Sequence, residues 1–148
     1  MTLETRLSQE IKTAMLARDA GRLSTLRLLK SAVGYAQLER KTESLSDPEF
    51  VAVVQKEIKK RRDAIEQFEK GGRPELVAKE QAETRVLETF LPQPLPAAEL
   101  EQLIKATIQE LGATTKKEMA PVIKAVQAKA AGRADGKSIS SVVAKLLT

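Results

Sequence analysis

The chain has 148 residues, of which 42% are hydrophobic and 30% are charged, with only seven glycines and six prolines. This composition is typical of one compact domain or two small helical ones, and it excludes a disordered or a fibrous chain. The net charge of +5 is compatible with a polyanionic partner, and the absence of cysteine excludes disulfides and thiol chemistry.

Apolar residues at helical spacing predict two amphipathic helices at the start of the chain, over residues 3–17 and 22–40. Thr2 can cap the first of them, and Gly21 marks the break before the second. We expect the two helices to pack against each other.

The third predicted helix is the longest and follows Ser46. Ser46 and Glu49 can form a capping box, and Pro48 fits the first turn because it has no amide to lose. The pair Gly71–Gly72 ends the helix after roughly 35 Å. Its apolar seam has heptad spacing, consists of Val51, Val54, Ile58, Ile65 and Phe68, and is interrupted by Arg61.

A fourth helix is predicted from Pro74 until prolines at every second position, starting at Pro92, force the chain to be extended. We place a domain boundary there, between residues 1–94 and residues 95–148. The second part has three apolar stripes, with a Thr115–Glu118 capping box before the middle one. The stripes are Leu100, Leu103, Ile104, Thr107, Ile108 and Leu111; Met119, Val122, Ile123 and Val126; and Ile139, Val142, Val143, Leu146 and Leu147.

These elements predict an all-α fold, with an N-terminal domain of about four helices, including the long third helix, and a small three-helix C-terminal bundle. No apolar run reaches the roughly 18 residues needed to cross a bilayer, and the start of the chain does not resemble an export signal. We therefore expect a cytoplasmic protein that is not inserted into a membrane.

The residues that most often carry catalysis are missing, since the chain has no histidine and no cysteine. The nearest approach to a catalytic group is a serine and lysine cluster, which we interpret as cap and solvent-facing residues of a helix. Its members are Lys137, Ser138, Ser140, Ser141 and Lys145. The acids Glu66, Glu69, Glu80, Glu83 and Glu88 are interpreted as parts of ion-paired solvent faces. We predict no catalytic residue, no metal site and no cofactor.

The densest basic stretch lies in the third helix and supplies candidate RNA-binding residues, which are Lys56, Lys59, Lys60 and Arg62. Helical geometry spreads the cations of this stretch over more than one face, so only some of them can serve a single partner. Glu57 and Arg61 are spaced for an ion pair. A solvated helix with internal ion pairs is therefore the alternative interpretation.

Residues 95–148 are more basic than the rest, with eight lysines and arginines against five acids. The candidate RNA-binding residues here are Lys116, Lys117, Lys124, Lys129, Arg133 and Lys137. Within Gly132–Lys137, Asp135 can cap the last helix, while exposed amides and flanking cations could accept a phosphate; a plain turn is the alternative. With so few aromatic residues, recognition of RNA is expected to use backbone phosphates and to be sensitive to salt.

Several separated motifs resemble the bacterial YqeY family over nearly the whole chain. They are Leu26–Arg27, Gln55–Arg61, Asp63–Glu66, Gly72–Leu76, Leu91–Pro92 and Gly132–Lys137. The last domain is also similar to the tail of the B subunit of the tRNA-dependent amidotransferase. That similarity covers Ile123–Lys124, Gly132–Asp135 and Leu146–Leu147, although Gly136 stands where the tail usually has proline.

The resemblance implies a helical module that contacts tRNA, because the amidotransferase tail touches the outer corner of tRNA while kinase and amidase chemistry reside elsewhere in that enzyme. It implies tRNA as a partner, together with an amidotransferase or an aminoacyl-tRNA synthetase. A label of carbon–nitrogen ligase with glutamine as nitrogen donor would come by homology alone. Two alternatives stay open: a protein-interaction module that presents the seam of the third helix, and a hydrolase or ligase that acts without histidine or cysteine.

Overall fold

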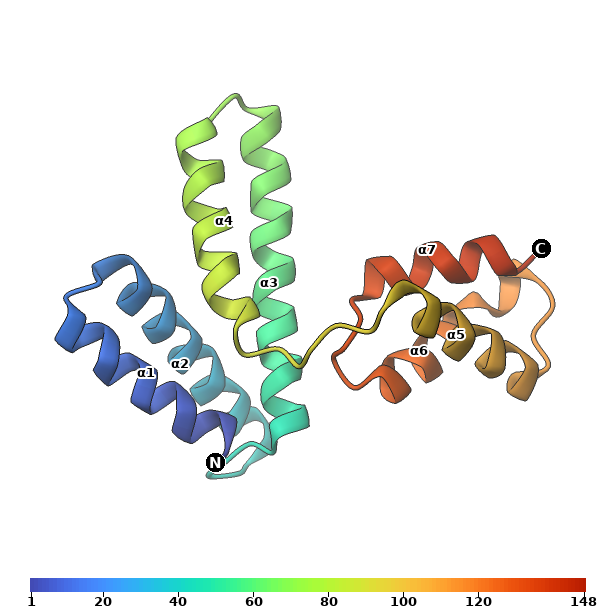
Figure 1. Cartoon of the computed structure of the whole chain (residues 1–148), viewed down its shortest axis with the longest axis horizontal. Helices are drawn as coiled ribbons and strands as arrows, with labels where there is room; N and C mark the ends of the chain where they lie inside the picture. The colour runs from blue at the N-terminus through green and yellow to red at the C-terminus, as the bar shows by residue number, and fades with distance from the viewer. The chain divides into compact units, whose positions relative to one another are not determined.

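The computed structural model describes residues 1–148 and is entirely helical, which confirms the predicted fold class (Figure 1). Two compact units, Met1–Leu91 and Pro92–Thr148, are described separately below. The first contains α1 (Leu3–Ala17), α2 (Ala20–Arg40), α3 (Asp47–Lys70) and α4 (Pro74–Glu88). The second contains α5 (Ala97–Leu111), the 3₁₀ turn η1 (Lys116–Glu118), α6 (Met119–Ala130) and α7 (Gly136–Leu146). No helix has both the length and the hydropathy that crossing a membrane requires.

Helices α1 and α2 pack together as expected, but α2 begins earlier than the sequence predicted. The side chain of Asp19 accepts a hydrogen bond from the amide of Arg22 at 3.2 Å, and this cap places Gly21 inside the first turn of the helix. The expected break at Gly21 is therefore wrong. The chain turns instead at Arg18, whose left-handed backbone (φ 55°) ends α1.

The core of the first unit lies between the inner faces of its four helices. The rings of Phe50 in α3 and Phe90 after α4 are buried, with centroids 5.7 Å apart. Leu26 and Leu29 of α2 and Leu87 of α4 belong to the same cluster. Helices α3 and α4 lie side by side, and the far half of this hairpin extends beyond α1 and α2 (Figure 1).

The apolar seam of α3 is covered from within the chain at its first four positions, whereas Ile65 and Phe68 are only half-buried. Its first half, including Arg61 at 9% exposure, is buried where α3 packs on α1, α2 and α4. The Nε of Arg61 lies 3.1 Å from the carboxylate of Glu83 in α4, and its Nη1 lies 3.6 Å from that of Glu57. The first four seam positions are thus closed to a partner, and binding of a partner to the rest of the seam stays a prediction. The prediction of a solvent face is wrong for Glu83, whose side chain is only 16% exposed.

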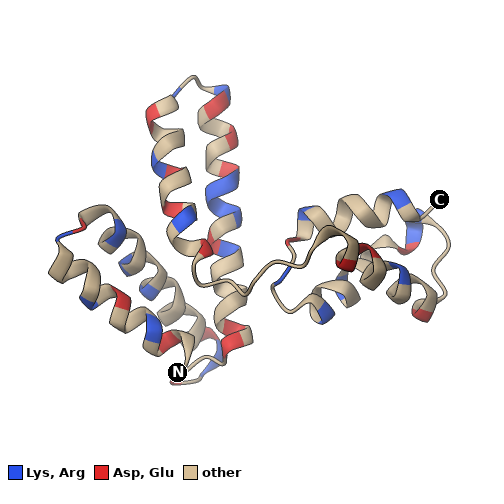
Figure 2. Ribbon diagram, in the orientation of Figure 1, with Lys and Arg blue, Asp and Glu red and all other residues tan.

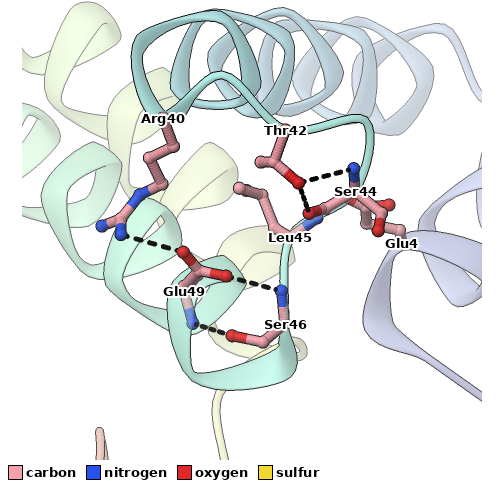
Figure 3. Close-up of polar contacts among 7 residues, drawn as sticks. All are labelled: Glu4, Arg40, Thr42, Ser44, Leu45, Ser46 and Glu49. Atoms are coloured by element: carbon pink, nitrogen blue, oxygen red, sulfur yellow. Dashed lines mark hydrogen bonds and ion pairs between the residues drawn. The ribbon is translucent and has the colours of Figure 1, made fainter.

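The turn between α2 and α3 is held by a polar network (Figure 3). The predicted capping box is confirmed, since the amide of Glu49 donates to the Ser46 hydroxyl and the Glu49 carboxylate accepts from the Ser46 amide at 2.9 Å. The same carboxylate pairs with Arg40 at 2.9 Å. Hydrogen bonds from the Ser46 backbone first, then from its hydroxyl, and the charge of Arg40 lower the pKa of Glu49. The carboxylate of Glu4 accepts the Leu45 amide at 2.7 Å and so ties this turn to α1.

The second unit is a three-helix bundle with its own core. Ile104 of α5, Val122 and Val126 of α6, and Ile139 and Val143 of α7 are all fully buried. The expected Thr115–Glu118 capping box does not form: these residues lead into η1, and the Glu118 carboxylate accepts the amide of Thr114 at 3.3 Å. The cap of α7 is present as predicted, because the Asp135 carboxylate accepts the Ser138 amide at 2.7 Å.

Candidate nucleic-acid interface

The outer side of α7 carries two lysines in line. Because Ile139 and Val143 are buried on the inner side, Lys137, Ser141 and Lys145, four residues apart, share the solvent-facing side. The two lysines are exposed, take part in no salt bridge within the chain, and lie about 12 Å apart along the helix axis. Figure 2 shows basic positions at both ends of α7.

Two further exposed lysines lie near the end of α7. The hydroxyl of Thr148 donates to the carbonyl of Thr114 at 3.4 Å, and Leu147 packs in one cluster with Ala113. This brings the last turn of α7 to the segment that leads into η1, where Lys116 and Lys117 are exposed and unpaired. We call Lys116, Lys117, Lys137 and Lys145 the α7 lysine stripe.

Lys145 belongs to this stripe but was not among the RNA-binding residues predicted from the sequence. Its signal was present in the sequence, since eight residues separate it from Lys137 and positions four residues apart share one helix face. The approach of η1 to the end of α7 could not be read from the sequence. That proximity depends on how the segment after α5 folds back onto the bundle.

The other C-terminal candidates are arranged differently. Lys124 is exposed on the outer face of α6, opposite Val122 and Val126. The ammonium of Lys129 points to α5, where it bonds to the carboxylate of Glu110 and to the hydroxyl of Thr107. The charge of Lys129 is therefore balanced within the bundle, and Lys129 and Lys124 do not share a face.

Arg133 joins the α6–α7 turn to the proline-rich segment. Its Nε donates to the carbonyl of Gln93 at 2.9 Å, and its own carbonyl accepts the amide of Leu95 at 2.8 Å. Gly132 before it has a left-handed backbone (φ 86°), which glycine adopts without steric cost. Since the Asp135 carboxylate occupies the first turn of α7, an anion there would meet a negative charge.

The basic stretch of α3 belongs to the first unit. Lys56, Lys59 and Lys60 are exposed on the side of α3 opposite its buried seam, because they are three and four residues apart. Lys60 lies 3.7 Å from Glu57, so the interpretation as an ion-paired surface applies to it. Arg62 is exposed one turn after Lys59 and lies on the other side of the helix from Lys60.

Two shallow hollows occur in the first unit. One, of about 310 Å³, lies at the α3–α4 turn and includes Phe68 and Val77. The other, of about 390 Å³, lies on α2. Neither includes the C-terminal serines, and no three carboxylates converge as a metal site would require.

Comparison with known proteins defines the family. A sequence model described as "Yqey-like protein" matches residues 4–147. The chain belongs to the YqeY-like family. Relatives of this YqeY-like chain occur in fungi, among them the protein named "Altered inheritance of mitochondria protein 41, mitochondrial" of Kluyveromyces lactis, which is 35% identical over 121 residues. An uncharacterised protein of Schizosaccharomyces pombe is 34% identical over 91 residues.

The shared region is only part of some YqeY-like proteins. The match covers 82% of this chain and 64% of the Kluyveromyces lactis protein. The protein of the same name from Eremothecium gossypii is 32% identical, and the match covers 66% of this chain and 52% of that protein. The names of these relatives place them in mitochondria and state no activity.

Proposed function

We propose that this chain is a non-catalytic accessory protein of the cytoplasm that binds tRNA through its C-terminal unit. The α7 lysine stripe carries the proposal, because its four ammonium groups are exposed and take part in no salt bridge within the chain. Unpaired cations of this kind attract phosphates without having to break an ion pair first. The resemblance of this unit to the amidotransferase tail supports tRNA as the nucleic acid and an amidotransferase or a synthetase as the associated enzyme.

The stripe is suited to phosphates and not to bases. Lysine provides a compact point charge on a flexible stem, which tolerates small changes in phosphate position. No aromatic ring accompanies it, since the second unit contains neither phenylalanine nor tyrosine. Recognition would therefore follow the shape and charge of the folded RNA, with little dependence on its sequence.

Titration of the purified chain with bulk tRNA at two salt concentrations tests this function. We expect micromolar or tighter binding that weakens as salt rises, because phosphate contacts release counterions. Replacing all four stripe lysines by glutamine is expected to make the salt dependence shallower, reducing the magnitude of the negative slope of log K against log salt by about 3. Absence of binding even at low salt would refute the proposal.

A matched variant controls for the loss of net charge. It replaces four exposed, unpaired lysines of the first unit by glutamine: Lys12, Lys30, Lys41 and Lys79. We expect this variant to keep most of the affinity of the natural chain. Equal weakening by both variants would mean that tRNA responds to overall charge and not to the stripe. A third variant, lacking Lys56, Lys59 and Lys60, measures what α3 contributes.

A further inference from the structure

The outer face of α2 is apolar and has no partner within the chain. Leu28, Tyr35 and Leu38 are 50%, 75% and 77% exposed. With Ser24 and Ser31 they follow the alternating four- and three-residue spacing that places side chains in one line along a helix. The buried residues of α2, such as Leu26 and Val33, lie on the opposite side and already fill the core.

The first half of this face is hollowed. Arg27 and Leu28 line the hollow of about 390 Å³ together with Ala20, Leu23, Ser24 and Ser31. A depression of this size, lined by three apolar residues, two serines and one cation, can receive a side chain from another molecule. The single tyrosine of the chain stands further along the same line, and tyrosine is one of the residues enriched at binding hot spots.

One border of the face is positively charged. Arg27, Lys30 and Lys41 are exposed and form no ion pair within the chain, whereas Arg22 and Arg40 of the same helix pair with Glu10 and Glu49. Arg27 and Lys30 are one turn apart on the same side of α2, and Lys41 follows the last residue of the helix with a left-handed backbone. A partner that covers the apolar line would therefore meet positive charge along one edge.

Gly34 adds an independent observation. It lies in the middle of α2, where glycine weakens a helix relative to alanine, and apart from the adjacent backbone of α2 nothing comes within 4 Å of the place where a Cβ would stand. Packing within the chain thus does not require glycine at this position. Gly34 continues the line of Arg27 and Ser31, where the lack of a side chain would let the backbone of another helix approach closely.

We propose that the outer face of α2 binds an acidic amphipathic helix of a partner protein. The leucines of that helix cover Leu28, Tyr35 and Leu38, and its carboxylates pair with Arg27 and Lys30. A helix is the matching shape because the exposed residues form a straight, narrow line with heptad spacing. This site is separate from the α7 lysine stripe and does not depend on the proposed binding of tRNA.

Fluorescence anisotropy with two designed peptides tests the proposal on the full chain. Each peptide has about three heptads with leucine at positions a and d, and carries either glutamate or lysine at positions e and g. We expect the glutamate peptide to bind at least roughly tenfold more tightly than the lysine peptide. Equal affinity of the two peptides, or no binding of the glutamate peptide, would overturn the proposal.

Variants locate the binding face. Leu28→Ser with Leu38→Ser is expected to lower the affinity for the glutamate peptide about tenfold. Arg27→Glu with Lys30→Glu is expected to abolish the preference for the glutamate peptide over the lysine peptide. Leu111→Ser is the matched control, since Leu111 is an exposed leucine of the second unit, and it should change nothing. All these side chains are exposed, and circular dichroism verifies that each variant is folded.

Two other occupants of the same face would contradict the proposal. Self-association would appear in sedimentation as a dimer that Leu28→Ser with Leu38→Ser dissociates. A membrane surface would appear as binding to vesicles that contain phosphatidylserine, without preference for the glutamate peptide. A chain that sediments as a monomer, does not bind the vesicles and binds the glutamate peptide more tightly than the lysine peptide supports an acidic helical partner.

Discussion

Arg61 is a cation in a position where the heptad spacing calls for an apolar side chain. Its guanidinium is kept in the core of the first unit by the carboxylates of Glu57 and Glu83 and by the carbonyl of Glu57. A charge buried in this way is tolerated only while its partners remain in place. The long stem of arginine also packs among the apolar residues on either side.

We expect Arg61→Ala to lower the free energy of unfolding by about 3 kcal/mol, because it leaves Glu83 enclosed without a counter-charge. Urea unfolding measures the change. Lys60→Ala removes the other cation near Glu57. Because the side chain of Lys60 is well exposed, this change should lower the free energy of unfolding by less than about 0.5 kcal/mol. The double variant Arg61→Leu with Glu83→Leu should recover most of the loss; failure to recover would mean that the arginine stem, and not its charge, is what matters.

Glu49 gives the stability of the first unit a pH dependence. Because its pKa in the folded chain lies below the ordinary value of 4.5, the ionised carboxylate stabilises the fold above that value. This contribution is lost as the pH falls through the lowered pKa. Glu49→Gln, which can still accept the Ser46 amide, should therefore be less stable than the natural chain near neutral pH. The difference in melting temperature should vanish at the acidic end, and a constant difference would contradict this account.

At the scale of single helices, periodicity was sufficient to predict every α-helix, because each one buries an apolar stripe of regular spacing. The errors lie at the ends. The cap by Asp19 extends α2 past Gly21, and η1 forms where a capping box was expected. Helix ends depend on a few hydrogen bonds worth about 1 kcal/mol each, which competing local geometries can also supply.

Gly34 and Gly112 form a matched pair for testing helix α2 and the end of helix α5. Both have open space where a Cβ would stand, but Gly112 has a left-handed backbone (φ 67°) and Gly34 does not. We expect Gly34→Ala to stabilise the chain by about 0.5–1 kcal/mol and Gly112→Ala to destabilise it by about 1 kcal/mol. Thermal unfolding measures both. A loss of stability in Gly34→Ala would show that α2 requires glycine for its own packing.

At the scale of the whole molecule, the two units have separate cores. Leu26 and Ile104 are completely buried, one in each cluster, and the clusters share no residue. Leu26→Ala and Ile104→Ala should each cost about 3 kcal/mol within one unit. Hydrogen exchange should then show faster exchange in α1–α4 for the first variant and in α5–α7 for the second. Faster exchange throughout the chain in either variant would indicate a single cooperative unit.

The candidate site was predictable only in part. Composition and spacing pointed to Lys116, Lys117 and Lys137 as exposed cations, and the structure places them on the surface. What they could not indicate is which cations are already used: Lys129 faces Glu110, and Arg61 is enclosed by acids from two helices. The pairs Lys129–Glu110 and Arg61–Glu83 connect residues far apart in the sequence, so they depend on tertiary packing, whereas the Glu57–Arg61 pair could be predicted from its spacing. The exposed apolar face of α2 could not be predicted either, because the exposure of its residues depends on how the helices pack.

The hydrogen bond between Arg133 and Gln93 uses only part of the guanidinium. A guanidinium has several N–H groups pointing in different directions; the Nε–H holds the Gln93 carbonyl, and no bond within the chain uses the two Nη groups. Arg133 therefore anchors the proline-rich segment and keeps N–H groups that are not used within the chain. A lysine in its place would have to hold the Gln93 carbonyl with its one ammonium, so an otherwise conservative exchange would leave no second nitrogen unused.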